Sequence, residues 1–441
     1  MNSAWFTVSG YEVRNDDLWV VATAVCASVA CGLVGCFLVL RRMSLLGDAI
    51  SHAILPGLAA AFLVTGSREP ISMLTGALVV GVLTAVLSSG LSRWGRVSED
   101  ASMGVVFTTL FAIGVVLITW AARNVDLDPG CVLYGLIEFA PFDTMLVLGH
   151  ELPRSFVWLA VILIVNATLI VVFFKELKVV SFDPFLATTM GISATLLHYA
   201  LMTSVAATAV ASFESVGSIL VVAMLVAPGA TAHLLTDRLA PLLWIAALLA
   251  ALSAVAGYVA AVALNTSVAG AIATSSLALF VLVLFAAPRH GVIAKQYRQF
   301  ALSARIRRED VLGLLFRWHE QVDAIGTAGH TPGPTTTDVA SLTRTRWAGS
   351  LLVRWLRWSG LVVRQPDRSL RLTDAGVAES RRLVRGHRLW ETYLAKRVGV
   401  DAARVHGAAH KAEHFLSDRL REDLHEDLGE STDPHGRSIP S

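Results

Sequence analysis

Charged residues are scarce in this chain of 441 residues. Asp, Glu, Lys and Arg together make up 16% of it, hydrophobic residues make up 54%, and the mean hydropathy is +0.61. This composition excludes an ordinary soluble protein, because a surface exposed to water carries far more charge. Most of the chain is therefore predicted to lie in membrane lipid.

Cysteine is also rare, and its spacing excludes two kinds of site. The four cysteines, Cys26, Cys31, Cys36 and Cys131, form no CxxC pair. A zinc ribbon or a disulfide framework would need paired or regularly spaced cysteines. We interpret these residues as ordinary packing residues of a membrane domain.

Two further signals are missing from the sequence. The N-terminal segment has no basic region ahead of an apolar core and no small-residue cleavage site, so we expect the first span to act as its own insertion signal. The sequence GxxxxGK[ST], whose backbone cradles nucleotide phosphates, does not occur. We therefore expect this chain to bind no nucleotide and not to be an enzyme, so that ATP hydrolysis would be carried out by a separate ATPase subunit.

The apolar residues form runs that are long enough to cross a bilayer, which takes about 20 residues. Nine segments qualify: 18–40, 44–65, 71–91, 102–122, 155–175, 192–211, 217–235, 241–264 and 268–287. Residues 131–150 are apolar but contain Pro141 and Asp143, and we expect an external or re-entrant helix there. The sequence predicts an all-α polytopic membrane domain over residues 1–290.

Basic residues indicate the orientation of these spans, because Lys and Arg in short loops remain in the cytoplasm. They follow every odd-numbered span: Arg41 and Arg42, Arg93 and Arg96, Lys175 and Lys178, Arg238, and Arg289. We expect a multi-pass protein of the cell membrane, with its N-terminus outside and its C-terminal part in the cytoplasm.

After residue 303 the sequence becomes rich in charge. Short helices are expected at 338–345 and 347–359, and a two-stranded hairpin within 364–373. This order is typical of a winged helix, here over residues 303–375. Two longer amphipathic helices, 376–397 and 401–428, would then form a further domain over residues 376–441.

One pair of ionisable residues lies within the second predicted span. Asp48 and His52 are four residues apart, so both project from one face of a helix. Ionisable groups at membrane depth are usually functional, and a carboxylate with an imidazole suits Mn, Zn or Fe. The pair predicts a site for metal in transit, and from spacing alone the alternative is a helix cap or an interhelical hydrogen bond.

The C-terminal part contains six residues whose side chains and spacing suit metal ligands. They are His387 and Glu391 on one predicted helix, and His406, His410, Glu413 and His414 along one face of the next. Two facing helices could build one or two sites of nitrogen and oxygen ligands for Mn, Fe, Co or Zn. A solvated charged face would more often include Lys and Gln.

The membrane part resembles a known family. LRRMSLLGDAISHAILPG (40–57), FDPFLATTMGI (182–192) and SVGSILVVAMLVAPGATAHLL (215–235) resemble the permease subunits of manganese, zinc and iron ABC importers. The resemblance covers about residues 15–290. It implies that Asp48 and His52 line the substrate path. It also implies three partners: ABC ATPase subunits, an extracytoplasmic metal-binding protein, and a second permease copy or paralogue.

The same resemblance implies a contact with the ATPase. In that family a cytoplasmic turn after a PxATA segment docks on the ATPase. This role would fall here on Pro228, Gly229, Ala230, Thr231, Ala232 and His233. The segment 182–192 would lie beside it at the cytoplasmic face.

The C-terminal part resembles a second family. GHRLWETYL (386–394), VHGAAHKAEHFLSDRLREDL (405–424) and DPHGRSIP (433–440) resemble the diphtheria-toxin-repressor family of metal-dependent repressors, which join a winged helix to a metal-binding and dimerisation domain. The resemblance implies ligand roles for the six residues above and for Asp310. His410 stands where iron-responsive members have Cys and manganese-responsive members have Glu, and Gly313 replaces a carboxylate. The metal therefore stays open among Mn, Fe and Zn.

Such a repressor domain could bind DNA. Residues 344–358 would supply the helix that enters the major groove, with Arg344, Arg346, Arg354 and Arg357 at phosphates. Three tryptophans make this helix unusually apolar, and a membrane tether limits the DNA that can be reached. We therefore favour feedback control of metal import over a membrane-anchored, metal-dependent transcription regulator.

Overall fold

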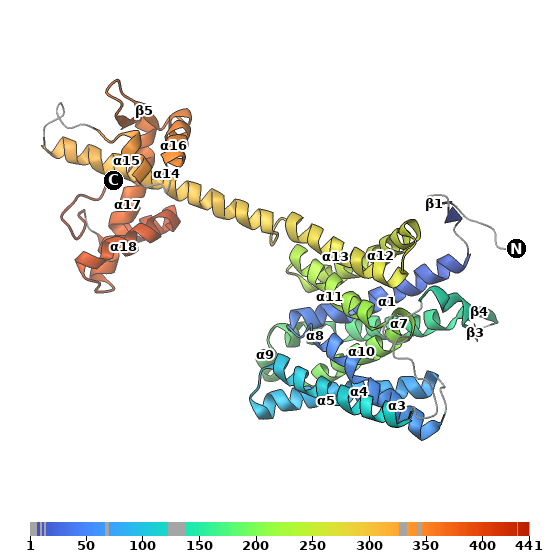
Figure 1. Cartoon of the computed structure of the whole chain (residues 1–441). Helices are drawn as coiled ribbons and strands as arrows, with labels where there is room; N and C mark the ends of the chain where they lie inside the picture. Colours follow the sequence, from blue (N-terminus) through green and yellow to red (C-terminus); the bar gives the residue numbers. More distant parts are fainter. Residues whose placement is uncertain are drawn as a thin grey trace. The chain divides into compact units, whose positions relative to one another are not determined.

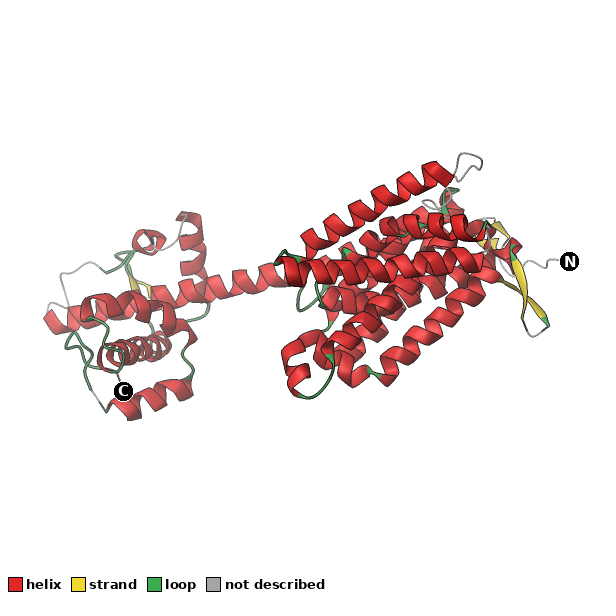
Figure 2. Ribbon diagram, turned by 90° about the horizontal axis from the view of Figure 1, so that it is seen from below, coloured by secondary structure: helices red, strands yellow, loops and turns green. Residues whose placement is uncertain are grey.

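The computed structural model describes residues 7–8, 11–12, 15–66, 70–121, 137–147, 149–325, 333–341, 346–429 and 431–440. These residues are mainly helical (Figure 2). Their strands form two-stranded antiparallel hairpins. The first hairpin pairs β1 Thr7–Val8 with β2 Tyr11–Glu12. The chain divides into two compact units, Met1–Lys295 and Gln296–Ser441.

The first unit is a bundle of apolar helices (Figure 1). Its helices are α1 Asn15–Leu40, α2 Leu46–Ala53, α3 Leu55–Thr65, α4 Pro70–Gly95, α5 Glu99–Ala121, α7 Arg154–Val172, α8 Phe174–Phe182, α9 Pro184–Thr189, α10 Ala194–Val216, α11 Ser218–Leu235, α12 Leu239–Leu264 and α13 Val268–Ala286. With α2 and α3 taken together, eight spans in the described part of the chain are long and apolar enough to cross a membrane. The expected seventh span is α11, whose apolar part, Leu220–Leu235, is shorter.

Helix α1 packs against α7, α11 and α12. The approach to α11 depends on Gly35, since a Cβ atom there would lie 1.8 Å from the carbonyl oxygen of Leu225. Small residues let helices come this close in lipid, where packing replaces the hydrophobic effect as the force between them. Cys31 and Cys36 are buried free thiols of α1, in keeping with a packing role.

The second expected span is interrupted. Helix α2 ends at Ala53 and α3 begins at Leu55, with Pro56 in its first turn. Proline lacks a backbone N–H and restricts the residue before it, so a break at this point is its ordinary effect. Asp48 and His52 therefore lie on the eight-residue helix α2.

The helix expected within residues 131–150 is found only in part among the described residues 137–147 and 149–150. They form a short 3-10 helix, η2 Ile137–Phe142, and a hairpin of β3 Thr144–Val147 with β4 His150–Pro153. Gly149 lies at the turn with φ +84, a conformation that favours glycine.

The second unit has the expected order of a winged helix followed by further helices. Its elements are α14 Val292–Ile325, α15 Thr336–Ser341, α16 Arg346–Trp358, β5 Val362–Arg364, β6 Leu370–Leu372, α17 Asp374–Lys396, α18 Ala402–Ala412, η3 Glu413–Phe415 and α19 Asp418–Leu428. The core of the winged helix contains Leu312, Leu315, Leu356 and Leu370.

The single helix expected over residues 401–428 is wrong. Helix α18 ends at Ala412, η3 follows it, and α19 begins at Asp418. Ser417 caps the new helix, because its hydroxyl accepts a hydrogen bond from the backbone N–H of Leu420. The break places Glu413 and His414 in η3, outside α18.

Candidate metal-binding sites

The predicted ligands of the second unit gather in two groups. We call the first the Asp310 site; its residues are Asp310, His410, Glu413 and His414. We call the second the His406 site; its residues are His387, Glu391 and His406. Within each group the candidate ligand atoms lie within 4.8 Å of one another. The structure thus brings all seven predicted ligands into one of two clusters.

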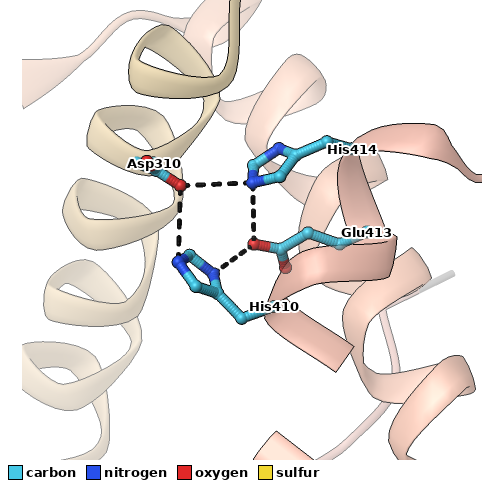
Figure 3. A group of neighbouring side chains, drawn as sticks. All are labelled: Asp310, His410, Glu413 and His414. Atoms are coloured by element: carbon cyan, nitrogen blue, oxygen red, sulfur yellow. Dashed lines mark hydrogen bonds and ion pairs between the residues drawn. The ribbon is translucent and has the colours of Figure 1, made fainter. Parts of the chain in front are cut away.

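The Asp310 site joins α14 to the end of α18 and to η3 (Figure 3). Asp310 Oδ1 lies 3.3 Å from His414 Nε2 and 3.7 Å from His410 Nε2. On the other side, Glu413 Oε1 lies 2.8 Å from His410 Nδ1 and 3.6 Å from His414 Nε2. Two carboxylates and two imidazoles therefore face a common centre.

Glu309 supports this site and was not predicted from the sequence. Its Oε2 lies 2.7 Å from His414 Nδ1, while its Oε1 accepts a hydrogen bond of 2.8 Å from Arg305. This contact leaves Nε2 of His414 directed at Asp310. A carboxylate behind a histidine ligand commonly sets its tautomer and ring orientation.

The His406 site lies between α17 and α18. His387 Nε2 is 3.1 Å from Glu391 Oε1, and His406 Nδ1 is 2.8 Å from the same oxygen. His387 and Glu391 are buried, whereas His406 is exposed. A cavity of about 240 Å³ adjoins the site, and His435 and Arg437 of the C-terminal segment also line it. The site is therefore open to an ion from solvent.

Carboxylates strongly perturb the titration of two of these histidines. Burial lowers the pKa of His387, but hydrogen bonds to Glu391 and Glu413 outweigh burial and raise it to about 9. Burial likewise lowers the pKa of His414, and its bonds to Asp310 and Glu309 raise it to about 9. Burial raises the pKa of Glu391, but the contacts with His387 and His406 lower it to about 2.

The donor sets fit a divalent transition metal. Nitrogen and oxygen ligands lie about 2.0–2.2 Å from such ions, so ligands on opposite sides of an ion are roughly 4 Å apart. The atoms of both groups lie close to that spacing. Since neither group contains sulfur, the ligands suit Mn, Fe or Zn better than a soft ion such as Cu(I).

In the first unit, Asp48 and His52 lie side by side as their spacing predicted. Asp48 Oδ1 is 3.6 Å from His52 Nε2, and the two side chains are 47% and 43% exposed. The His52 ring also packs against Phe107 and Phe111 of α5. The pair offers two ligand atoms on a half-open face, fewer than the four that a zinc ion usually takes.

Comparison with known proteins decides the family of the membrane unit. Residues 17–287 match the ABC 3 transport family. The chain belongs to this family. It is 48% identical over 283 residues to the manganese transport system membrane protein MntD of Bacillus subtilis (strain 168), covering 64% of this chain and 96% of that protein. It is 42% identical to the zinc transport system membrane protein TroD of Treponema pallidum (strain Nichols), covering 63% and 75%.

A solved structure supports the same assignment for this ABC 3 family member. PsaBC from Streptococcus pneumoniae, in complex with Fab, is 31% identical with a TM-score of 0.52, covering 62% of this chain and 92% of that one. Residues 373–441 match a second family, the iron dependent repressor, metal binding and dimerisation domain. Both resemblances seen in the sequence are confirmed, and this ABC 3 permease carries a repressor-type metal-binding domain.

The predicted ATPase contact of this ABC 3 permease lies within a helix. Residues 228–233 all belong to α11, which ends at Leu235, so the turn that follows the PxATA segment begins after them. Pro228, Gly229, Thr231 and Ala232 are buried, and Gly229 packs against Cys36 of α1. Ala230 is half-buried and His233 is exposed. Only His233 of the six residues presents a largely open side chain.

The arginines predicted to contact DNA lie on or before α16. Arg354 and Arg357 are exposed on this helix. Arg344 lies outside the described residues, as does the side chain of Arg346. Trp355 and Trp358 are also exposed, the latter to 89%. The outer face of α16 in this ABC 3 family member is therefore both cationic and aromatic.

Proposed function

We propose that this chain is the permease subunit of an ATP-driven importer for a divalent transition metal, with a C-terminal domain that senses metal in the cytoplasm and restrains import. The metal would be Mn, Zn or Fe. One observation supports the proposal best. A single chain combines an ABC 3 permease with a repressor-type domain that contains two clusters of nitrogen and oxygen ligands.

The transit step would use Asp48 and His52. A carboxylate and an imidazole bind these metals without sulfur and so allow exchange. Because the pair supplies two ligand atoms and is half exposed, a second permease copy or paralogue that presents its own pair would complete four ligands. An extracytoplasmic metal-binding protein would deliver the ion.

ATP hydrolysis would come from separate ATPase subunits, and α9 is a suitable surface for them. Asp183 caps this short helix through the N–H groups of Phe185 and Leu186. The side chain of Phe185 is 87% exposed, and Leu186 and Met190 are exposed beside it. An orientation with the N-terminus outside, as the basic loops predict, would place α9 and the C-terminal domain in the cytoplasm with the ATPase.

Feedback requires that metal bind one state of the transporter more tightly than another. We infer that occupancy of the Asp310 and His406 sites favours the closed permease. Both sites draw ligands from separate helices, so an ion would hold α14, α17 and α18 together. The packing of the second unit would then depend on the concentration of metal in the cytoplasm.

Uptake by proteoliposomes tests both parts of this proposal. They would contain the full chain with its ATPase and binding protein, with metal buffered on the side of the C-terminal domain. We expect Asp48→Ala/His52→Ala to abolish uptake. We expect His410→Ala/His414→Ala to leave uptake intact at low buffered metal and to remove its inhibition at high metal.

Two control variants make the outcome decisive. His150→Ala changes an exposed histidine of the β3–β4 hairpin, and His425→Ala an exposed histidine of α19 outside both clusters. Both should behave as the unmodified protein does. Undiminished uptake by the Asp48/His52 variant would reject the transit site, and unchanged inhibition in the His410/His414 variant would reject feedback.

DNA binding is the second candidate function, favoured by the exposed Arg354 and Arg357 on α16. Base edges in the major groove are read by polar side chains, and the exposed Trp355 and Trp358 suit that task poorly. Metal-dependent retention of an operator fragment by the full chain in detergent, lost in Arg354→Ala/Arg357→Ala, would favour this function over feedback.

A further inference from the structure

A pocket of about 370 Å³ lies in the first unit, and neither Asp48 nor His52 lines it. It is formed where the end of α1, the connection to α2 with the start of that helix, the end of α4, α5, the α8–α9 connection and the start of α10 come together. We call it the Arg41 pocket. Its polar lining is Arg41, Arg42, Ser88, Ser89, Ser92, Arg93, Ser181, Thr195 and His198. Its volume falls within the range of small-ligand sites, about 300–1,000 Å³.

The charge of the pocket is of one sign. Three guanidinium groups line it, and no Asp or Glu does among the residues that the structure describes. The first turn of α10, a helix of 23 residues, adds the positive end of its dipole through Thr195. A divalent cation would be repelled here, so the pocket does not suit the metal path.

Arg41 is held in place by a chain of contacts. Its Nη1 lies 3.2 Å from His198 Nδ1, and Nε2 of the same ring lies 3.1 Å from Ser89 Oγ. These contacts join α1, α10 and α4 and hold the guanidinium at the pocket wall. An arginine fixed in this way loses little further side-chain entropy when it binds an anion.

The hydroxyl of Ser88 supplies an independent indication of a ligand. Ser88 is 4% exposed, and its Oγ has no hydrogen-bond partner within the described part of the chain. One turn earlier, Thr84 donates to the carbonyl of Val80, so the helix does offer such a bond. A buried hydroxyl without a partner destabilises the fold, and a bound acceptor would offset that cost.

We propose that the Arg41 pocket binds a phosphate-type oxyanion. Guanidinium groups and hydroxyl donors are the usual partners of phosphate oxygens. The phosphate belongs either to the head group of an anionic lipid or to a free phosphate ion, and the chemistry of recognition is the same for both. This proposal is independent of the metal and of the transport activity proposed above.

Binding is measured on the full chain in nanodiscs. One arm counts phosphatidylglycerol retained from mixed phosphatidylglycerol and phosphatidylcholine discs by native mass spectrometry. The other measures radiolabelled inorganic phosphate at equilibrium in discs of phosphatidylcholine alone. We expect saturable binding in at least one arm, weakened about tenfold or more by Arg93→Gln and by Arg41→Gln, a change of roughly 1.4 kcal/mol or more, and measurably weakened by Ser88→Ala.

Matched controls separate the pocket from general surface charge. Arg96→Gln removes an exposed arginine near the same end of α4 that does not line the pocket. Ser276→Ala removes another buried hydroxyl without a partner in the described residues, in α13. Both should leave binding unchanged. Retention of phosphatidylglycerol alone identifies a lipid site, and binding of inorganic phosphate identifies a soluble ligand. Absence of saturable binding in both arms, or equal losses in Arg96→Gln and Arg93→Gln, overturns the proposal.

Discussion

His387 Nδ1 lies 2.6 Å from Glu413 Oε2, and this contact joins the two candidate metal sites. The other oxygen of Glu413 lies 2.8 Å from His410 in the Asp310 site. The other nitrogen of His387 lies 3.1 Å from Glu391 in the His406 site. Glu413 therefore has one oxygen in the Asp310 site and the other at His387, and His387 has one nitrogen in the His406 site and the other at Glu413. The contact between these two residues links the two sites directly.

Substitution of Glu413 should therefore weaken both sites. Glu413→Gln removes a charged oxygen from the Asp310 site and the acceptor that orients His387 for the His406 site. We expect affinity to fall by about 10- to 100-fold or more at each site, the size usual for loss of a ligand's supporting partner. Calorimetric titration of the full chain with Mn²⁺ measures both sites, with Glu422→Gln on exposed α19 as the control. A loss of metal affinity confined to the Asp310 site would contradict a link between the two sites through Glu413 and His387.

Glu309 should affect the Asp310 site alone. Its contact with His414 Nδ1 orients the ring, and its hydrogen bonds to His414 and Arg305 involve no residue of the His406 site. Glu309→Ala is expected to reduce metal affinity at the Asp310 site by about 10- to 100-fold. The same titration measures this change, and Asp323→Asn, an exposed carboxylate of the same helix, should leave it unaltered. Equal losses at both sites would instead indicate general disruption of α14.

The stability of the metal-free second unit should depend on pH through His387. Its folded pKa of about 9 lies above the ordinary value of 6.5, so the stabilisation is complete below pH 6.5 and disappears as pH rises through 9. For this buried residue the shift corresponds to roughly 3 kcal/mol, shared with its carboxylate partners. Glu391, with a pKa of about 2, acts oppositely and loses its contribution as pH falls from 4.5 through 2.

Urea unfolding of the full chain, followed by a probe in the second unit at pH 5.5, 7.5 and 9.5 with chelator present, measures this dependence. Stability should fall from pH 5.5 to pH 9.5. His387→Gln should make this fall smaller without abolishing it, because the pKa of His414 is also raised to about 9. Added metal must displace the proton from His387, so its stabilising effect should grow with rising pH over the same interval. A profile identical in the variant would assign the dependence to other groups.

In the membrane unit, Gly35 should tolerate no side chain. A Cβ there would meet the carbonyl oxygen of Leu225 at 1.8 Å, so Gly35→Ala must separate α1 from α11. We expect a large fall in the thermal unfolding temperature in detergent. Gly104 of α5 has no neighbouring atom within 4 Å of such a Cβ, and Gly104→Ala should be neutral or stabilise by about 0.5–1 kcal/mol. Similar temperatures for the two variants would contradict the close approach.

Much of this protein follows from local sequence. Runs of about 20 apolar residues predicted the spans because lipid demands an internally bonded helix. The interval of four between Asp48 and His52 placed both on one helix face. Similar spacing named six candidate ligands of the second unit, to which the resemblance to the repressor family added Asp310. Apart from Asp310, these inferences need only the periodicity, length and side-chain chemistry of residues that are close together in the sequence.

Tertiary structure decided how those residues are grouped. Helix α18 carries both His406 and His410, yet packing assigns them to different clusters, His406 with residues of α17 and His410 with Asp310 of α14. Glu309 reaches His414 across more than a hundred residues of sequence. The Arg41 pocket likewise collects arginines and serines from helices that no local pattern places together. Sequence spacing predicts which face of a helix a side chain occupies. Which other element packs against that face depends on contacts between segments far apart in the sequence, and local periodicity does not encode those contacts.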